Sequence, residues 1–526
     1  MTRENSVIKS WIPEKLIVPL LAISLLPHLM LLSMFSLNST FTASFLDVEA
    51  DDLQFMFSMA YGLIVCGLFL HNRLFSAINV KSYLLLMTML NILILLGMTV
   101  TTNPQAILVL RFLQGPMTLF EGAIILPILM SHIKNPNAKF IGYCVLYGLM
   151  LTSDKFTTSI IKFAIENYSH NVMVYSLVAL HVMALLIYLF IFNAKRMFPK
   201  VPLYQLNLSG VMLMVICLIS GAYFFIYGKR YDWFESPRIV IALGLCILCG
   251  ALFVLFQMTS KRPLFHFSVL KSKRVVFGIF IFFIFYILRS SMGNIYQVMS
   301  VVWKWPWEYI LKIQYINVAG SVIGVVISYL LFARQLSFRK IFVIGFLLLA
   351  ASMLWFSFLF YPDTTVGAIG IPLFLEGVGQ GIIFTPLVFF MIGSVHASIS
   401  SHASQTGTAI RFWSTTIGFA LMQNLVLYLS TKYQFLLTRN LDQTHPVFQQ
   451  EWSSLMDKLS ATHLENDAVH LSVMALKAKL ASQALLIANT EIFRWLAVLG
   501  FAAFILILLY RPLLFVWKKR PGRARC

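Results

Sequence analysis

Charged side chains are scarce in this sequence. Only 11% of its 526 residues are Asp, Glu, Lys or Arg, whereas about a quarter of the residues in a soluble domain are charged. Hydrophobic residues make up 59% of the chain, and its mean hydropathy is +0.82. Apolar surface on this scale needs lipid to cover it. The composition therefore excludes an ordinary soluble protein and predicts an all-α protein that crosses a membrane many times.

Cysteines and catalytic motifs are also few. Of six cysteines, Cys246 and Cys249 form a CxxC pair, but this pair lies in an apolar run with no His or third Cys nearby, so we interpret both as packing residues. The sequence lacks HExxH, a paired-His box, GxSxG and a Walker loop, on which metal-dependent, nucleophilic and nucleotide-using enzymes depend. We therefore expect no metal site, no cofactor and no enzymatic activity.

Apolar runs long enough to span a bilayer recur along the whole chain. A spanning helix needs about 20 apolar residues. The first run is long and lacks a small-residue cleavage site, so we interpret it as a span and not as a signal peptide. The sequence predicts fourteen transmembrane helices, at about residues 16–36, 55–72, 82–101, 105–131, 140–165, 171–193, 207–227, 237–257, 275–293, 313–333, 340–360, 366–394, 408–430 and 492–515.

Acidic residues are half as frequent as basic ones, 20 against 40. The basic clusters fall in alternate connections, as cytoplasmic loops do. They are Arg3, Lys9 and Lys15; Arg73 and Lys81; Lys134 and Lys139; Lys195, Arg196 and Lys200; Lys261, Arg262, Lys271, Lys273 and Arg274; Arg334, Arg339 and Lys340; and Lys518, Lys519, Arg520, Arg523 and Arg525. This alternation predicts both termini in the cytoplasm, and it favours contact with the lipid bilayer over contact with nucleic acid.

The longest polar segment covers residues 431–491, and the predicted topology places it outside the cytoplasm. From about His470, apolar residues recur at helical spacing, so we expect a helix that leads into the last span. We interpret the segment as a solvated helical hairpin. A lid or a partner-docking element is the alternative.

Several short motifs carry a family resemblance. Residues 228–236 read Gly-Lys-Arg-Tyr-Asp-Trp-Phe-Glu-Ser, and residues 262–274 form a Pro-containing basic loop before the ninth run. Arg111-Phe-Leu-Gln114-Gly115 lies in the fourth run, and Gly377, Gly379, Gly381 and Pro386 lie in the twelfth. In these motifs the chain resembles the EmrB/QacA-type, fourteen-span branch of the major facilitator superfamily, the drug–proton antiporters.

The resemblance implies the major facilitator fold, with six, two and six helices. Residues 1–200 are expected to form the N-terminal bundle, 201–262 the two inserted helices, and 263–526 the C-terminal bundle with its loop at 431–491. It also implies alternating access to a central cavity lined mainly by spans 1, 4, 9 and 12. In Gram-negative cells, family members in the inner membrane often work with a periplasmic adaptor and an outer-membrane channel.

The chain departs from the family pattern at two places. After the second run the best match is Asn72, Leu74, Ser76, Asn79 and Lys81, which lacks the family's acidic residue and has Asn in place of both glycines. Since Asn is the next best residue where φ must be positive, we expect the turn to be retained. In the fifth run, Leu151-Thr-Ser-Asp154-Lys155 stands where the family's antiporter motif ends. The resemblance alone therefore does not establish proton coupling.

Ionisable residues inside apolar runs are the best pointers to function, because each is costly in lipid. We assign proton coupling or gating to Arg111, Glu121 and Asp154. A buried carboxylate such as Glu121 can exchange protons near neutral pH; the alternatives are a neutral acid bonded to a neighbouring helix and a counter-charge for a cationic substrate. For Arg111 the alternative is a structural tie to backbone carbonyls. Asp154 and Lys155 are adjacent, so they point about 100° apart on a helix and are not expected to pair.

Four more residues are assigned to the substrate cavity on the implied lining helices. They are His28, Gln114, Arg289 and Glu376. His28 alone, beside Pro27, is more typical of a hydrogen-bonded core residue, and Glu376 precedes a Gly-rich stretch that also suits close helix packing. Arg411 is expected at the cytoplasmic end of its span, bound to a lipid phosphate or a helix terminus.

These observations predict a secondary transporter. We expect it to export hydrophobic or amphipathic compounds, cationic ones included, by proton-coupled alternating access. One alternative keeps the fold and exports an endogenous metabolite, siderophore or peptide. An alternative from another class is a membrane sensor or assembly protein that transports nothing.

Overall fold

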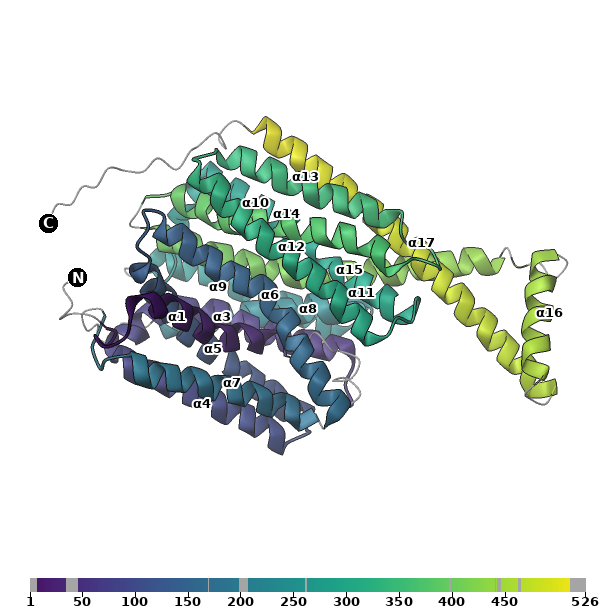
Figure 1. The fold of residues 1–526 in the computed structure, drawn as a ribbon, viewed down its shortest axis with the longest axis horizontal. Helices are drawn as coiled ribbons and strands as arrows, with labels where there is room; N and C mark the ends of the chain where they lie inside the picture. The colour runs from purple at the N-terminus through teal and green to yellow at the C-terminus, as the bar shows by residue number, and fades with distance from the viewer. Residues whose placement is uncertain are drawn as a thin grey trace.

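The computed structural model describes residues 7–34, 46–168, 170–197, 207–260, 263–396, 399–439, 441, 446–461 and 465–510. These residues form a bundle of long helices, with the N-terminal helices on one side and most C-terminal helices on the other (Figure 1). One isolated antiparallel bridge joins Ile8 to Phe192. The tail basic residues 518–525 and Arg3, Lys200, Lys261 and Arg262, on which the charge pattern partly rests, lie outside the described residues.

The helix order follows the predicted apolar runs. The first group holds α1 (Glu14–Leu32), α3 (Ala50–Ala77), α4 (Val80–Val100), α5 (Pro104–His132), α6 (Ala138–Asn167) and α7 (His170–Ile191). Next come α8 (Leu208–Tyr227) and α9 (Pro237–Thr259). The last group holds α10 (Lys273–Ser290), α11 (Met292–Val301), α12 (Trp307–Ala333), α13 (Phe338–Ser357), α14 (Val366–Gly393), α15 (Ser400–Arg439), α16 (Pro446–Ser460) and α17 (Glu465–Leu509).

Each of the fourteen predicted runs coincides with a helix of the bundle. By length and hydropathy, 12 helical stretches of the described residues could cross a membrane. The two predicted spans outside this set are α6 and α15, which carry more polar residues than the others. The chain is therefore a multi-pass helical membrane protein, and the count of fourteen spans stays a prediction.

The connections that carry basic clusters meet at one end of the bundle, which we call the basic end. Glu14 at the start of α1 pairs with Lys134 between α5 and α6. Lys195 after α7 accepts from the backbone N–H of Val80 at 3.1 Å, and Ser272 before α10 donates to the Ser394 carbonyl after α14 at 3.1 Å. This arrangement agrees with the predicted alternation of loops. Which side of the membrane the basic end faces stays a prediction.

The connection from α3 to α4 differs from expectation. The residue before α4, Asn79, has φ −69° and ψ 146°, so its backbone is extended. The expectation that Asn at this place supplies a left-handed turn is therefore wrong. The helix α3 instead runs on to Ala77 and leaves only two residues before α4.

Glycines bring α12 and α14 into direct backbone contact. A Cβ atom on Gly377 would lie 2.4 Å from the carbonyl oxygen of Asn317, and one on Gly381 would lie 2.4 Å from that of Ser321. Side chains would push the two helices apart at both places. The interpretation of these glycines as sites of close helix packing is confirmed.

The segment 228–236 holds the hairpin between α8 and α9 against α3. Arg230 lies 2.9 Å from the Glu49 carboxylate and 3.3 Å from that of Asp52. The Tyr227 hydroxyl donates to Asp52 at 2.6 Å. Asp232 and Trp233 both have φ 52°, and a Cβ on Gly228 would come within 2.4 Å of the Trp233 ring. The motif therefore builds a tight turn that orients Arg230 toward the start of α3.

The polar segment 431–491 is helical and extends beyond the bundle. With 40 and 45 residues, α15 and α17 are about 60 and 68 Å long, about twice the hydrocarbon thickness of a bilayer. Their distal parts and α16 project from the bundle (Figure 1). Lys479 on α17 pairs with Glu451 on α16 at 2.7 Å and lowers the pKa of that carboxyl. The expected helical hairpin is confirmed for the described residues; residues 442–445 and 462–464 of the segment lie outside them.

Candidate functional site

A cavity of about 410 Å³ lies between the two groups of helices. Its walls come from α1, α3, α5 and α6 on one side and from the first turns of α15 on the other. Most lining residues are aliphatic or aromatic. The polar ones are His28, Tyr61, His71, Thr118, Tyr143, Tyr147, Ser401, Ser404, Gln405, Thr408 and Arg411.

Behind this wall, Glu121 of α5 lies at the centre of a buried polar cluster. Its Oε2 atom is 2.5 Å from Nδ1 of His28 on α1, and its Oε1 accepts from the Asn91 amide of α4 at 3.3 Å. His181 of α7 stacks edge-on against His28, with ring centres 5.4 Å apart. All four side chains are at most 2% exposed. His28 also lines the cavity, whereas Glu121 does not.

Hydrogen-bond roles in the cluster can be assigned from its outer partners. The Tyr188 hydroxyl has one proton and donates it to the Ser24 carbonyl at 3.3 Å, so it accepts from Nε2 of His28 at 2.8 Å. Nδ1 of His28 then has a free lone pair directed at Glu121, unless the ring is an imidazolium. Nδ1 of His28 and Oε2 of Glu121 then face each other at 2.5 Å, close enough to share a hydrogen bond.

His28, Glu121 and His181 bring three possible metal-ligand atoms close together. One donor atom each from His28, Glu121 and His181 lies within 4.8 Å of the other two. Two ligands on a tetrahedral zinc ion, however, stand about 3.3 Å apart, and the His28–Glu121 separation is 2.5 Å. In the present arrangement these two atoms are closer together than two ligands of one zinc ion.

Arg111 ties the end of α1 to α5. It donates to the Leu31 carbonyl at 2.8 Å and to the Leu32 carbonyl at 3.2 Å. These carbonyls lie at the C-terminal end of α1, where the regular helical hydrogen bonds end, and the Leu31 carbonyl also accepts from the backbone N–H of Met34 at 3.4 Å. Gln114, one turn on, accepts from Arg111 at 2.5 Å, and neither residue lines the described cavity. The geometry matches the structural alternative for Arg111, while its coupling role and the cavity role of Gln114 stay predictions.

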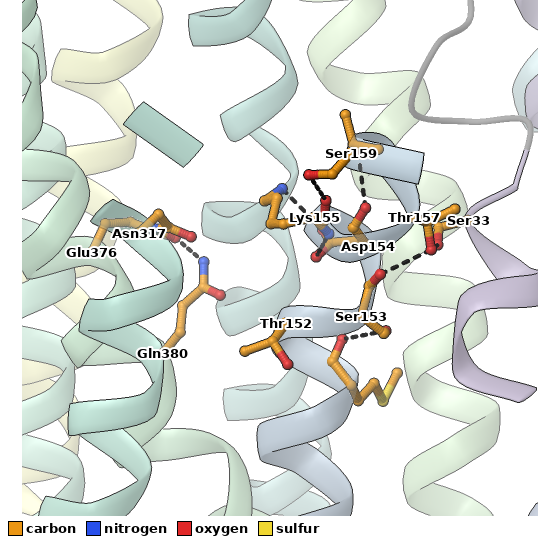
Figure 2. A network of polar contacts seen from close by, with 12 residues as sticks. Ser33, Thr152, Ser153, Asp154, Lys155, Thr157, Ser159, Asn317, Glu376 and Gln380 are labelled. Atoms are coloured by element: carbon orange, nitrogen blue, oxygen red, sulfur yellow. Dashed lines mark hydrogen bonds and ion pairs between the residues drawn. The ribbon is translucent and has the colours of Figure 1, made fainter. Parts of the chain in front are cut away.

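Asp154 and Lys155 form an ion pair, contrary to the sequence-based expectation. Nζ of Lys155 lies 2.9 Å from Oδ2 of Asp154, and Figure 2 shows the two side chains meeting on α6. The two side chains do leave the helix in directions about 100° apart. The four-carbon lysine side chain is nevertheless long enough to bend back toward Asp154. The ammonium also lies 5.2 Å from the ring centre of Tyr296 on α11.

Glu376 of α14 lies fully buried across from this pair (Figure 2). Asn317 of α12 donates to it at 2.6 Å, and the Gln380 amide one turn along α14 also donates to it. Lys155, Asp154 and the half-buried Arg289 lie near enough to act on Glu376 electrostatically. Neither Glu376 nor Arg289 lines the cavity described above. Their assignment to a substrate cavity stays a prediction.

On the side away from the basic end, two polar contacts join α6 to α12, and the Gln423 amide of α15 also donates to Asp51 of α3 at 2.6 Å. Ser159 of α6 and Tyr315 of α12 share a hydrogen bond of 2.6 Å. Three residues on, Lys162 lies 3.3 Å from the Glu308 carboxylate at the start of α12. Both contacts are exposed on at least one side and are therefore of the kind that can break and re-form.

The position of Arg411 in the structure differs most from the position expected from the sequence. It was expected at a span end with lipid phosphate. Instead it is only 9% exposed and lies in the cavity wall. Its guanidinium carbon is 5.5 Å from the ring centre of Tyr147 and 5.8 Å from that of Phe384. The physical reason is that α15 begins at Ser400, so Arg411 is three turns inside the helix.

Several partners of the site were not identified from the sequence. His181, Tyr188, Asn91 and Asn317 lie in apolar runs, and only the fold brings the first two to His28, Asn91 to Glu121 and Asn317 to Glu376. The contact of Gln380 with Glu376 could have been predicted from the sequence, because the two residues are one helical turn apart. A rule that flags every lone polar residue in an apolar run would have found all five, together with many that have only packing roles.

No family model matches the chain. Among curated proteins it is 25% identical over 336 residues to the probable multidrug resistance protein EmrY of Escherichia coli K12, covering 60% of this chain and 59% of that protein. It is 22% identical over 322 residues to the multidrug export protein EmrB of the same strain, with the same two shares. The chain thus matches just under three-fifths of the length of these relatives.

The fold agrees with solved transporters. A POT family transporter crystallised with 5-aminolevulinic acid superposes with a TM-score of 0.61 at 12% identity, covering 98% of this chain and 100% of that one. The chain therefore has the fold of this solved transporter. In sequence it is similar to the multidrug export proteins EmrY and EmrB over 60% of its length.

Proposed function

We propose that this protein is a secondary active transporter of the inner membrane that exports hydrophobic or amphipathic compounds by alternating access. The observation that carries the proposal is the cavity of about 410 Å³ whose walls belong to both helix groups. When the groups rock against each other, such a cavity is exposed first to one side and then to the other. The mainly apolar wall suits greasy substrates, and the names of the multidrug relatives support this substrate class.

The proposed energy source is a proton held by His28 and Glu121. Nδ1 of His28 lies 2.5 Å from Oε2 of Glu121, and His28 forms part of the cavity wall. The groups facing the pair are Asn91 and Tyr83 of α4 and His181 and Tyr188 of α7. Among the ion pairs of the described residues, none joins Glu121 to a Lys or Arg. A carboxyl without a fixed counter-charge can gain and lose a proton during transport.

The second proposed coupling group is Asp154. Its pair with Lys155 on α6 faces Glu376 on α14, so charge on one helix group acts on the other. Protonation of Asp154 would leave Lys155 without its partner in a buried place, which costs several kcal/mol. That cost favours a rearrangement of α6 relative to α14.

The test is efflux of lipophilic dyes from liposomes that contain the purified protein. Glu121→Gln is expected to abolish the response to a pH gradient and to keep substrate exchange at zero gradient, because exchange moves no net proton. Asp154→Asn is expected to weaken the gradient response. Asp363→Asn, in an exposed loop, serves as the matched control. Gradient dependence at the wild-type level in both variants would remove the coupling assignment.

The alternatives predict other outcomes of the same assay. An exporter of an endogenous metabolite, siderophore or peptide would move that compound and ignore the dyes, so a substrate panel separates it. A sensor or assembly protein would move nothing under a proton gradient or a membrane potential. The polar networks described above give no specific support to either alternative.

A periplasmic adaptor and an outer-membrane channel are the proposed partners. The docking element would be the projection formed by α16 and the distal parts of α15 and α17. It extends beyond the thickness of a bilayer and exposes Phe435 and Met474 to solvent. An exporter that passes its substrate to a channel needs a contact of this kind on the side where substrate leaves.

A further inference from the structure

Two thiol groups meet between α8 and α9, the helices that the segment 228–236 joins. Sγ of Cys217 on α8 lies 3.9 Å from Sγ of Cys246 on α9. Both cysteines are free and half-buried, whereas Cys249 is buried. The fold therefore pairs Cys246 with a cysteine 29 residues away in the chain, a contact that the CxxC spacing of Cys246 and Cys249 did not predict.

Two glycines make room for these sulfur atoms. Gly221 lies one helical turn after Cys217, and a Cβ atom on it would come within 3.0 Å of the Cys246 sulfur. Gly250 lies one turn after Cys246, and a Cβ atom there would lie 3.3 Å from the Cys217 sulfur. Each sulfur therefore packs against a glycine of the opposite helix. Small residues at a helix interface let the two backbones approach closely, as a bond between the helices requires.

The gap between the two sulfur atoms can be closed by side-chain rotation. The sulfur atoms of a disulfide are about 2.05 Å apart, so the free thiols must approach each other by about 2 Å. Rotation about a Cα–Cβ bond from one staggered position to the next moves a cysteine sulfur by about 3 Å. The pair can therefore be joined with little change in the packing of α8 against α9.

The pair is accessible to reagents that are dissolved in the lipid. Among the 12 helical stretches that could cross a membrane, α9 has the smallest buried share. Cys217 and Cys246 lie near the middle of their helices, which corresponds to the interior of the hydrocarbon region. A charged reagent is costly to bring to this depth. An oxidant that reaches the pair must therefore be uncharged and lipid-soluble, as quinones are.

We propose that Cys217 and Cys246 are a redox modification site, at which a lipid-soluble quinone forms a disulfide between α8 and α9. Both S–H bonds break and one S–S bond forms. The quinone takes up the two electrons and the two protons and becomes a hydroquinone. A dithiol reverses the step by returning two electrons and two protons. Neither cysteine lines the described cavity, so the inference does not depend on the proposed transport function.

Oxidation by duroquinone tests the proposal, because the fully substituted ring of this quinone oxidises thiols without adding to them. Reduced protein in nanodiscs is incubated with duroquinone and then denatured. Its free thiols are counted with a maleimide, and linked peptides are identified by mass spectrometry without reductant. The wild type is expected to lose two of its six thiols and to yield one peptide pair that joins Cys217 to Cys246. Dithiothreitol is expected to restore all six thiols.

The disulfide is also expected to raise the melting temperature of the protein. The bond closes the loop that contains the turn at 228–236, and a closed loop restricts the unfolded chain. Treated wild type is therefore expected to melt at a higher temperature than reduced wild type. Cys217→Ser and Cys246→Ser are each expected to keep all their remaining thiols and to melt at the same temperature with and without duroquinone.

A matched control separates this pair from the CxxC spacing. Cys249→Ser leaves both Cys217 and Cys246 in place and is expected to lose two thiols, as the wild type does. The size-exclusion profile reports whether each variant is folded. Three results would each overturn the proposal: six free thiols in the treated wild type, a linked peptide that joins Cys246 to Cys249, or the loss of two thiols in a folded Cys217→Ser variant.

Discussion

At the scale of single residues, the site depends on which groups accept hydrogen bonds from its buried donors and which groups balance its buried charges. His28 is hydrogen-bonded to Tyr188 and lines the described cavity, while its assignment to substrate binding stays a prediction. Its orientation is fixed by Tyr188, which accepts from Nε2 and so leaves Nδ1 for Glu121. The Tyr188 hydroxyl is therefore a positioning group for the proton and does not line the cavity.

This relation predicts the effect of Tyr188→Phe. Loss of the hydroxyl leaves Nε2–H of His28 without an acceptor in a buried site, which costs about 1–3 kcal/mol. His28 can then rotate, or its proton can move from Nε2 to Nδ1. A protonated Nδ1 can no longer accept a hydrogen bond from a protonated Glu121. We expect the pH profile of dye efflux to shift and the gradient-driven rate to fall about tenfold, with substrate affinity unchanged. Tyr428→Phe, at an exposed position, is the control, and an unaltered pH profile would contradict the assignment.

At the scale of helices, length and surface decide what each element does. The glycines of α12 and α14 allow backbone contact, so these two helices are expected to move as one body. The helices α15 and α17 are about twice as long as a bilayer needs, and with α16 they form the projection. Nothing in the cavity depends on this distal part, because the cavity wall uses only the first turns of α15.

The projection can therefore be shortened without disturbing the site. We expect that replacing residues 442–464 by a short flexible linker leaves dye efflux from liposomes unchanged. In cells, where the proposed adaptor is present, the same variant should lose drug resistance while keeping its membrane level. Loss of efflux in liposomes would show that the segment serves the transport cycle itself, and full resistance in cells would remove it as a docking element.

At the scale of the whole molecule, alternating access requires the two helix groups to separate. They meet at the cavity and, away from the basic end, through the Ser159–Tyr315 hydrogen bond, the Lys162–Glu308 pair and the Gln423–Asp51 hydrogen bond. The first two contacts join α6 to α12, and the third joins α15 to α3. These contacts must break if the cavity is to open on that side of the membrane.

A short chemical bridge at this place is expected to stop transport. With cysteines at positions 159 and 315, a bis-methanethiosulfonate reagent should reduce efflux to background, and a reducing agent should restore it. Binding of substrate should remain, because neither position lines the cavity. The single-cysteine variants treated with the same reagent are the controls. Full efflux after complete cross-linking would show that these two helices do not part during the cycle.

The sequence by itself determined the helical plan of this protein. Apolar runs placed a helix at each of fourteen positions because hydrocarbon tolerates no unpaired backbone groups, so span length is dictated by the bilayer. The same reasoning singled out Glu121, Asp154 and Glu376, since each charge in an apolar run is costly enough to be noticed. The glycine-rich stretch of α14 likewise predicted close packing against a neighbouring helix.

Only the tertiary structure decided how these residues are used. Side chains 28, 121 and 181 come from three helices, and no spacing along the chain predicts that they meet. The flexible lysine side chain allowed the Asp154–Lys155 pair that helix geometry alone argues against. Arg411 shows the same limit most clearly. The sequence gives its distance from the start of a run, while the packing of α15 against α3, α10 and α14 decides that it faces a cavity and not the membrane surface.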